Sequence, residues 1–125
     1  PVVPNRPYKS SSSENTYNED LLDLHAIRAE IERMARSSAA WLARKELLAR
    51  TVIIKVRYAG FTTVTRSHTS AVPTRDPNEI AARALSLLDR TEAGRRPIRL
   101  LGAGVHGLAG GNAAVGAPGV LGFDE

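Results

Sequence analysis

The stretch that decides the fold reads Lys55-Val56-Arg57-Tyr58-Ala59-Gly60-Phe61-Thr62-Thr63-Val64-Thr65-Arg66-Ser67. Two β-rich runs flank Ala59-Gly60, which is typical of a tight hairpin turn in which glycine supplies a positive φ. Apolar and cationic residues alternate through Val52, Lys55, Val56 and Arg57, so a strand here would bury one face and show positive charge on the other. The stretch carries three cations, a row of hydroxyls and no acid. Such a face suits a phosphate backbone better than it suits catalysis.

Composition indicates one domain. The chain has 125 residues and 42% of them are hydrophobic, which suffices for one modest core. It has no cysteine, which excludes a disulfide framework, thiol catalysis and cysteine-ligated zinc, and is compatible with a cytoplasmic protein. No apolar run reaches the roughly 18 residues of a membrane helix, so we expect no membrane partner. Because the chain begins Pro1-Val2-Val3-Pro4 without Met, we expect it to be part of a longer protein.

Charge is unevenly distributed around a net value of +4. Residues 14–32 hold six acids and one base, whereas residues 33–75 hold nine Lys or Arg and one acid. This split predicts one negative and one positive face. A plainer alternative stays open, namely that helix arginines such as Arg33, Arg36 and Arg44 are simply solvated.

Two amphipathic helices are expected. Between residues 21 and 47, apolar residues recur at steps of three and four, with Asn18 or Asp20 as the candidate cap. Met34 and Trp41 fall on this apolar stripe, which assigns both to the core. The sequence Asp76-Pro77-Asn78-Glu79 opens the second helix, with Asp76 as cap, Pro77 at the first helical position and Glu79 closing a capping box.

The remaining segments complete the fold prediction. Residues 1–8 carry three prolines and read as an extended linker, and residues 109–125 read as a flexible Gly/Ala-rich tail. The four serines that follow Lys9 fit either a flexible tether or a short strand. Residues 51–58, 61–70 and 96–108 read as strands, and Gly102 and Gly104 imply a bulge or a close backbone approach in the last one. The order β-α-β-β-α-β predicts an α+β split βαβ fold, in which two helices cover one face of a four-stranded antiparallel sheet and the other face is open.

Catalysis has little support in these residues. Metal-dependent phosphoryl transfer needs converging carboxylates, whereas the acids here cluster at expected helix starts. Ser67 and His68 would point to opposite faces of a strand and cannot pair as nucleophile and base. The histidines at 25, 68 and 106 lack metal-ligand spacing. We therefore expect no catalytic residue and no metal site in this chain.

Nucleic-acid binding explains the polar side chains better. Along one face of a strand, side chains recur about every 7 Å, close to the spacing of successive phosphates. The strands carry no cluster of aromatics, which argues against base stacking and against an RNA-recognition module of the same topology. Alternation alone leaves open whether Thr65 or Arg66 faces outward. The candidate phosphate contacts are Lys55, Arg57, Thr63, Thr65, Arg66, Ser67 and Arg99.

The chain resembles the little finger domain of Y-family DNA polymerases of the DinB (DNA polymerase IV) type. The stretch 55–67 resembles the central hairpin of that domain. Its linker and first strand are similar to Pro4-Asn5-Arg6-Pro7-Tyr8-Lys9-Ser10-Ser11-Ser12-Ser13-Glu14-Asn15-Thr16-Tyr17. Its last strand is similar to Arg96-Pro97-Ile98-Arg99-Leu100-Leu101-Gly102-Ala103-Gly104-Val105. The three motifs occur in the right order within residues 1–108.

The resemblance implies a function and a division of the chain. Residues 1–8 would be the linker from a thumb, residues 9–108 the little finger and residues 109–125 a tail. The serines would then lie at the end of a strand, and the sheet would hold template-primer duplex DNA in its major groove, mostly by backbone contacts. The parent would be a translesion DNA polymerase whose palm, absent here, carries the carboxylates and Mg²⁺, so we expect no cofactor in this chain. By that comparison the DNA contacts include Lys9, Ser11, Ser13, Lys55, Arg57, Thr65, Arg66 and Arg99.

Two departures and two alternatives remain. Gly60 stands where the family often has Asp, which puts only the turn in doubt. The tail lacks the glutamine of a Gln-Leu-x-Leu-Phe clamp-binding peptide, so Leu121 and Phe123 are a degenerate candidate for binding the sliding clamp. The runner-up function is a split-βαβ interaction module that docks an acidic partner, and a small independent enzyme comes third.

Overall fold

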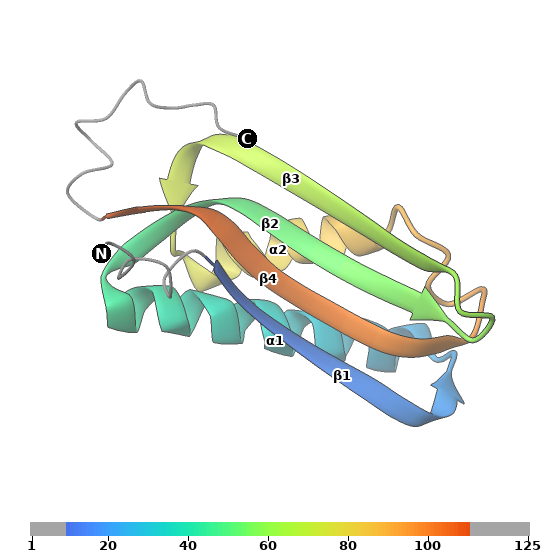
Figure 1. Ribbon diagram of the computed structural model, residues 1–125. Coiled ribbons are helices and arrows are strands. Elements are labelled where there is room, and N and C mark those ends of the chain that lie inside the picture. The colour runs from blue at the N-terminus through green and yellow to red at the C-terminus, as the bar shows by residue number, and fades with distance from the viewer. Residues whose placement is uncertain (1–9, 111–125) are drawn as a thin grey trace, which may run out of the picture.

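The sheet and its two helices form two layers (Figure 1). The computed structural model describes residues 10–110. Strands β1 (Ser10–Leu21), β2 (Leu47–Tyr58), β3 (Thr63–Thr74) and β4 (Ile98–Gly110) form one antiparallel sheet in the order β1-β4-β2-β3. Helices α1 (Leu24–Lys45) and α2 (Pro77–Leu88) pack side by side on one face. The predicted β-α-β-β-α-β order, with one sheet face left open, is confirmed.

The last strand completes the centre of the sheet. Helix α1 joins β1 to β2, and β4 lies between them; helix α2 joins β3 to β4, and β2 lies between those. The strands β1 and β3 are therefore the two edges. Expected linker residues 1–8 lie outside the described part, and β4 continues to Gly110, beyond the expected domain boundary at 108.

The core lies between the helices and the inner face of the sheet. Alternate residues of β2, Val52, Ile54 and Val56, are buried against α1 and α2, as are Leu101 and Val105 of β4. Burial of these aliphatic side chains is the main driving force for folding. The buried residues of the helices are Ile27, Ile31, Met34, Ala35, Ser38, Ala39, Leu42, Ile80, Ala81, Ala84, Leu87 and Leu88.

Core assignments from the sequence are confirmed, with one difference in degree. The Met34 side chain is 1% exposed. Trp41 is partly buried at the margin of the same cluster.

Helix starts agree only partly with the sequence. Asp76 caps α2 by accepting from the Asn78 N–H at 2.9 Å, as predicted. No capping box forms, because the Asp76 N–H donates to Thr74 Oγ1 instead (3.0 Å). The cap predicted for α1 is wrong. Since β1 continues to Leu21, the helix begins later, and Asp23 accepts from the His25 N–H at 2.9 Å.

The β2–β3 turn is wider than a two-residue hairpin. Paired residues end at Arg57 and Thr63, and the Tyr58 N–H donates to the Thr62 carbonyl at 2.8 Å. Phe61 has the positive φ of 70° in this turn, and Gly60 is not among the residues with positive φ. The prediction that Gly60 supplies it is therefore wrong. A Cβ added at Gly60 would meet nothing within 4 Å, so this position has no steric need for glycine.

Candidate nucleic-acid interface

Strand register places the polar side chains of the open face. Directly paired residues of antiparallel neighbours share a face, so the pairing of β1, β4, β2 and β3 defines cross-strand rows. Four rows lie opposite the helices, each written in strand order: Thr16–Leu100–Arg57–Thr63, Glu14–Gly102–Lys55–Thr65, Ser12–Gly104–Ile53–Ser67 and Ser10–His106–Thr51–Thr69.

Five of the predicted contacts share this face: Lys55, Arg57, Thr63, Thr65 and Ser67. The two cations stand two residues apart on β2, beside the hydroxyl column of β3. Arg57 Nε donates to Thr63 Oγ1 at 3.0 Å, which steadies the guanidinium without neutralising it. Lys, Arg and hydroxyl groups are the side chains that commonly contact phosphates. The arrangement therefore offers a phosphate chain both charge and neutral donors.

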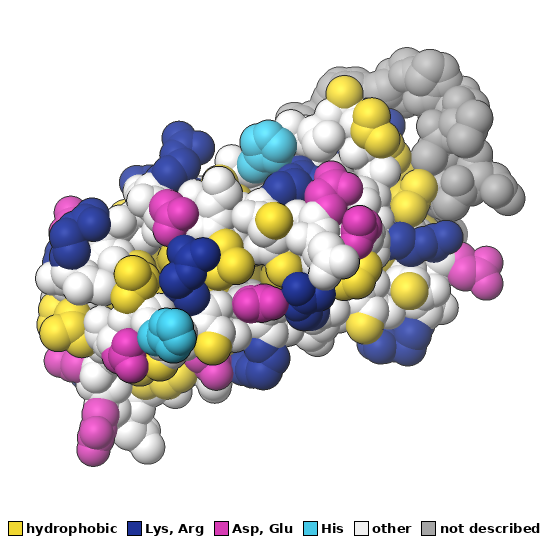
Figure 2. Space-filling model, turned by 180° about the vertical axis from the view of Figure 1, so that it is seen from behind, with side chains coloured by type: hydrophobic (Ala, Val, Ile, Leu, Met, Phe, Trp, Pro, Cys, Tyr) yellow, Lys and Arg dark blue, Asp and Glu magenta, His cyan; other side chains and the backbone are white. Residues whose placement is uncertain are grey.

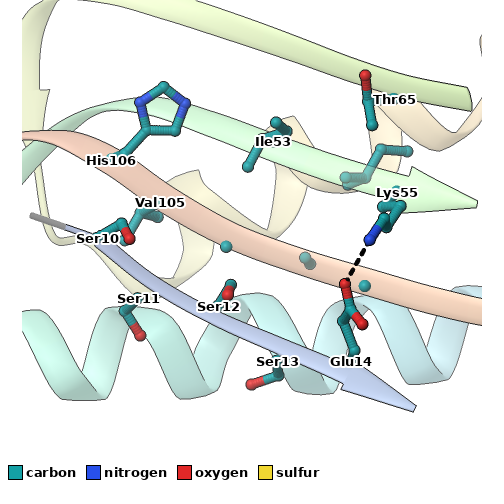
Figure 3. Close-up of a pocket in the computed structure, with 14 residues that line it drawn as sticks. Ser10, Ser11, Ser12, Ser13, Glu14, Ile53, Lys55, Thr65, Val105 and His106 are labelled. Atoms are coloured by element: carbon teal, nitrogen blue, oxygen red, sulfur yellow. Dashed lines mark hydrogen bonds and ion pairs between the residues drawn. The ribbon is translucent and has the colours of Figure 1, made fainter.

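A shallow hollow runs along β4 on the open face (Figure 3). Its volume is about 250 Å³, and its floor contains Gly102 and Gly104. A Cβ added at Gly104 would lie 2.6 Å from Ser12 Cβ, so the close approach predicted from the glycines is confirmed. Glycine here lets side chains of β1 lean across β4 toward β2.

One acid lies among these groups. Lys55 Nζ is 2.8 Å from Glu14 Oε2, and the ion pair crosses the hollow above β4 (Figure 3). Sequence reasoning missed this contact. Glu14 has the same alternation as Ser10 and Ser12, which could have indicated its face, but nothing in the sequence indicated that β1 pairs with β4 beside β2.

Ser11 and Ser13 do not lie on the open face. They pair with Val105 and Ala103, whose side chains face the helices, and Figure 3 shows them directed away from the hollow. Their neighbours Ser10 and Ser12 occupy the open face instead. The resemblance placed Ser11 and Ser13 among the contacts; as DNA contacts they stay predictions, with a position on the helix side of an edge strand.

Arg66 also lies on the helix side. It pairs with Ile54, and its Nη1 donates to the Thr65 carbonyl at 2.9 Å. Thr65 is therefore the residue of this pair that faces outward. Because β3 is an edge strand, Arg66 stands beside the sheet rather than on its open face.

Arg99 lies at the start of β4, where the register with β2 shifts. Its Nε donates to the Tyr17 carbonyl at 3.1 Å and lies 3.5 Å from Asp20 Oδ1. Arg99 is thus bound to β1, and the shift in register leaves it outside the four rows that hold Lys55 and Arg57. The predicted contacts Lys9, Leu121 and Phe123 lie outside the described residues.

The helix side carries mixed charge (Figure 2). Arg33 Nη2 is 2.8 Å from Glu30 Oε1, and Arg36 Nε is 3.0 Å from Glu32 Oε2. Spacings of three and four residues bring these partners together on a helix surface. The acids and bases of α1 therefore compensate one another, in agreement with the plainer alternative for Arg33 and Arg36.

Tyr17 fastens the edge strand β1 to α1. Its hydroxyl donates to Glu30 Oε1 at 2.9 Å. Burial, followed by the hydrogen bond and the charge of Glu30, raises the pKa of Tyr17 to about 12. The Arg33 guanidinium holds the pKa of Glu30 below its usual value. This network holds the strand that presents Glu14, Ser12 and Ser10.

Two arrangements that catalysis could use do not form within residues 10–110. Within residues 10–110, no three His, Cys, Asp or Glu side chains gather as metal ligands. Ser67 lies on the open face, while His68 lies on the helix side and accepts from Arg83 Nε at 3.1 Å, so the predicted separation of the two is confirmed. Neither helix of the described part is long and apolar enough to cross a membrane.

Comparison with known proteins begins with curated sequences. "DNA polymerase IV" of Halorhodospira halophila is 41% identical over 108 residues, which are 86% of this chain and 30% of the relative. The same name belongs to a protein of Alkalilimnicola ehrlichii (44% identical, 86% of this chain and 30% of the relative) and one of Streptomyces coelicolor (43%, 87% and 22%). The chain thus spans less than a third of the length of these relatives.

Solved structures agree with the fold. A complex of the β-clamp processivity factor and the little finger domain of PolIV matches with a TM-score of 0.61 and 26% identity, over 78% of this chain and 86% of that chain. An insertion ternary complex of Dbh DNA polymerase matches with a TM-score of 0.59 over 81% of this chain and 29% of that chain. At 11% identity, the second match shows the fold alone.

Family membership follows from the extent of the sequence match. A model of the impB/mucB/samB family C-terminal domain matches residues 8–116. The resemblance that the sequence motifs indicated is confirmed. The chain is therefore a member of the impB/mucB/samB family, of which it forms the C-terminal domain, with the fold of the PolIV little finger.

Proposed function

We propose that this domain holds duplex DNA for a translesion DNA polymerase of the DNA polymerase IV type. The observation that carries the proposal is the open face, where Lys55 and Arg57 adjoin the exposed hydroxyls of Thr63, Thr65 and Ser67. Such groups position a protein on the sugar-phosphate backbone without reading sequence. We therefore expect non-specific binding, with a Kd on the order of 10⁻⁴–10⁻⁶ M at physiological salt.

The hydroxyl column favours a phosphate partner over a carboxylate partner. Thr and Ser hydroxyls commonly contact phosphates, and side chains along one face of a strand recur at about the spacing of successive phosphates. The runner-up function, docking of an acidic protein, offers no such regular row of acceptors for Thr63, Thr65 and Ser67. The curated relatives named DNA polymerase IV give the duplex proposal further support.

Polymerisation itself is assigned to the part of the parent beyond this chain. The acids of residues 10–110 do not assemble a metal site, so they do not fit Mg²⁺, and no catalytic step is derived for them. The proposed Mg²⁺ belongs to the palm of the parent, and we propose that the whole protein acts in the cytoplasm. The clamp proposal rests on Leu121 and Phe123 of the tail, together with the related PolIV domain that was solved with a β-clamp.

The proposal is tested by duplex binding at several salt concentrations. We expect Lys55→Ala/Arg57→Ala to weaken binding of a fluorescent duplex, measured by anisotropy, and to reduce the salt slope by about one unit for each phosphate that the protein no longer neutralises. The matched control is Arg33→Ala/Arg36→Ala, which removes the same charge from the helix layer. Its affinity for the duplex should be higher than that of Lys55→Ala/Arg57→Ala and closer to that of the parent.

Two outcomes contradict the proposal. One is duplex binding by the open-face double variant that equals the parent at every salt concentration. The other is competition by polyglutamate of equal charge that is as effective as competition by unlabelled duplex. The second outcome would favour the acidic-partner function.

A further inference from the structure

The Glu14–Lys55 ion pair joins strands that are not neighbours. Strand β4 separates β1 from β2, and neighbouring strands lie about 4.8 Å apart, so the two backbones are about 10 Å apart. The register nevertheless places Glu14, Gly102 and Lys55 in one row on the open face. Both side chains reach over β4, and Nζ meets Oε2 at 2.8 Å.

Gly102 makes room for this crossing. A Cβ built on Gly102 would lie 3.0 Å from Glu14 Cγ and 3.7 Å from Lys55 Cβ. The first distance is tighter than an ordinary van der Waals contact, so any side chain at 102 would push the Glu14 arm away. The floor of the hollow is therefore shaped to let the carboxylate reach the ammonium.

The Glu14–Lys55 pair engages one of the two cations in the four rows of the open face. Among the described residues, the four rows of the open face contain one acid, Glu14. The same four rows contain two basic residues, Lys55 and Arg57. Arg57 has a hydroxyl partner and no ion pair within residues 10–110. A carboxylate oxygen and a phosphate oxygen bind an ammonium with the same charge-assisted geometry. Glu14 thus holds Lys55 as a DNA phosphate would.

Exchange of the two anions is energetically accessible. The side chains of Lys55 and Glu14 are 36% and 48% exposed. Ion pairs this exposed contribute little to stability, so an incoming phosphate can displace Glu14 at small cost. The displaced carboxylate then stands near the DNA, where like charges repel. The net effect is weaker duplex binding than the cations alone would give.

We propose that Glu14 is an intramolecular competitor for the phosphate that binds at Lys55, so that duplex binding replaces the Glu14–Lys55 pair with a phosphate–Lys55 pair. This inference rests on the proposed duplex-binding function. In this role Glu14 keeps the affinity for duplex DNA low, so that the DNA dissociates readily. It also explains why one acid lies in four rows whose other members are two cations, hydroxyl residues, glycines, His106 and the apolar residues Ile53 and Leu100.

The test is a double-mutant cycle on the whole chain with the same duplex. Glu14→Gln should tighten binding about 3- to 10-fold at low salt. It should also steepen the salt slope, because the released Glu14 carboxylate no longer attracts cations that partly offset those released from DNA. The same substitution in a Lys55→Ala background should give a clearly smaller gain, since no ammonium is left to release.

A matched control separates this exchange from a change of net charge. Glu32→Gln removes the same charge and frees Arg36 from an ion pair of 3.0 Å, but on the helix layer. It should change duplex affinity much less than Glu14→Gln. Thermal unfolding by circular dichroism verifies that each variant is folded.

The outcomes distinguish the two proposals. Equal affinities for the parent and Glu14→Gln, or an equal gain with and without Lys55, overturn the competitor role while leaving duplex binding intact. A parent chain that binds no duplex at low salt overturns both proposals. A gain that requires Lys55 and exceeds that of Glu32→Gln establishes the exchange.

Discussion

At the scale of single residues, Tyr17 shows how one hydroxyl secures an edge strand. Its hydroxyl group and the Arg33 Nη2–H both donate to Glu30 Oε1, at 2.9 and 2.8 Å. The pKa of Tyr17 is raised to about 12, first by burial and then by Glu30, whose own pKa is lowered by the Arg33 guanidinium. The folded chain therefore favours protonated Tyr17 beside ionised Glu30, and β1 is held to α1.

This pairing predicts a loss of stability at alkaline pH. The folded pKa of Tyr17 lies above its ordinary value of 10.0, so its contribution is fully present below pH 10 and is lost as the pH rises toward 12. Tyr17→Phe should lower the free energy of unfolding by about 1 kcal/mol at pH 7 and lack this part of the alkaline decline. Urea unfolding between pH 7 and the alkaline range, followed by circular dichroism, measures both effects.

Tyr58→Phe is the control for this prediction. The Tyr58 oxygen accepts a bond from the Glu92 N–H at 2.8 Å, so its loss costs stability without involving a carboxylate. That variant should keep the alkaline decline of the parent. If Tyr17→Phe keeps it too, the hydroxyl does not set the pH dependence.

The β2–β3 turn shows a feature that its own residues did not predict. Ala59-Gly60 predicted a two-residue turn, yet Phe61 takes the positive φ and its side chain is 81% exposed. Turn length depends on where strand pairing stops, here at Arg57 and Thr63, and this is a property of two strands rather than of the turn residues. For Gly104 the sequence indicated a bulge or a close backbone approach, and the short distance from Ser12 Cβ to a Cβ built at 104 shows the close approach.

At the scale of elements, the contrast between β2 and β1 explains which site residues could be predicted. In β2, buried Val52, Ile54 and Val56 alternate with Lys55 and Arg57, so hydrophobic alternation alone identified the open face. In β1, Ser10 to Asn15 contain no apolar residue, and alternation carried no information about direction. The resemblance, rather than alternation, therefore selected Ser11 and Ser13, which stay predictions as DNA contacts. The register with β4 shows that these two serines lie on the helix side and that Ser10 and Ser12 lie on the open face.

Neighbouring serines give a matched pair for testing the faces. Ser12 lies on the open face opposite Gly104, and Ser13 lies on the helix side opposite Ala103. Ser12→Asp should weaken duplex binding several-fold at low salt, because it places an anion beside the proposed phosphate path. Ser13→Asp has the same net charge and should weaken it much less. Anisotropy titrations of both variants, with unfolding curves to verify folding, provide the comparison.

Equal losses for the two serine variants would show that net charge, not the face of β1, controls binding. A larger loss for Ser13→Asp would favour DNA contacts on the helix side of β1, where Ser11 and Ser13 lie.

At the scale of the whole molecule, the helix layer and the sheet layer expose different kinds of side chain. Helices α1 and α2 cover the inner face of the sheet and show intermingled acids and bases to solvent (Figure 2), whereas the outer face carries Lys55 and Arg57 beside a hydroxyl column. The layer order was predictable, because amphipathic helices between strands must bury their apolar stripe against a sheet. The separation of charge between residues 14–32 and 33–75 was not a guide to the surface, since folding pairs Glu14 with Lys55, and the α1 helix pairs Glu30 with Arg33 and Glu32 with Arg36.

Chemical modification of the three histidines can show which layer of the domain binds DNA. His106 is exposed in the row Ser10–His106–Thr51–Thr69 of the open face, whereas His68 is exposed on the helix side of β3 and His25 is exposed in the first turn of α1. Duplex DNA seated on the open face should cover His106 and leave the other two accessible. Modification by diethyl pyrocarbonate, read by mass spectrometry, should therefore slow several-fold at His106 and little at His25. Polyglutamate at equal charge is the control for simple electrostatic association. Protection of His25 or His68 instead of His106 would place DNA against the helices, where acids and bases alternate and the hydroxyl column of β3 has no function.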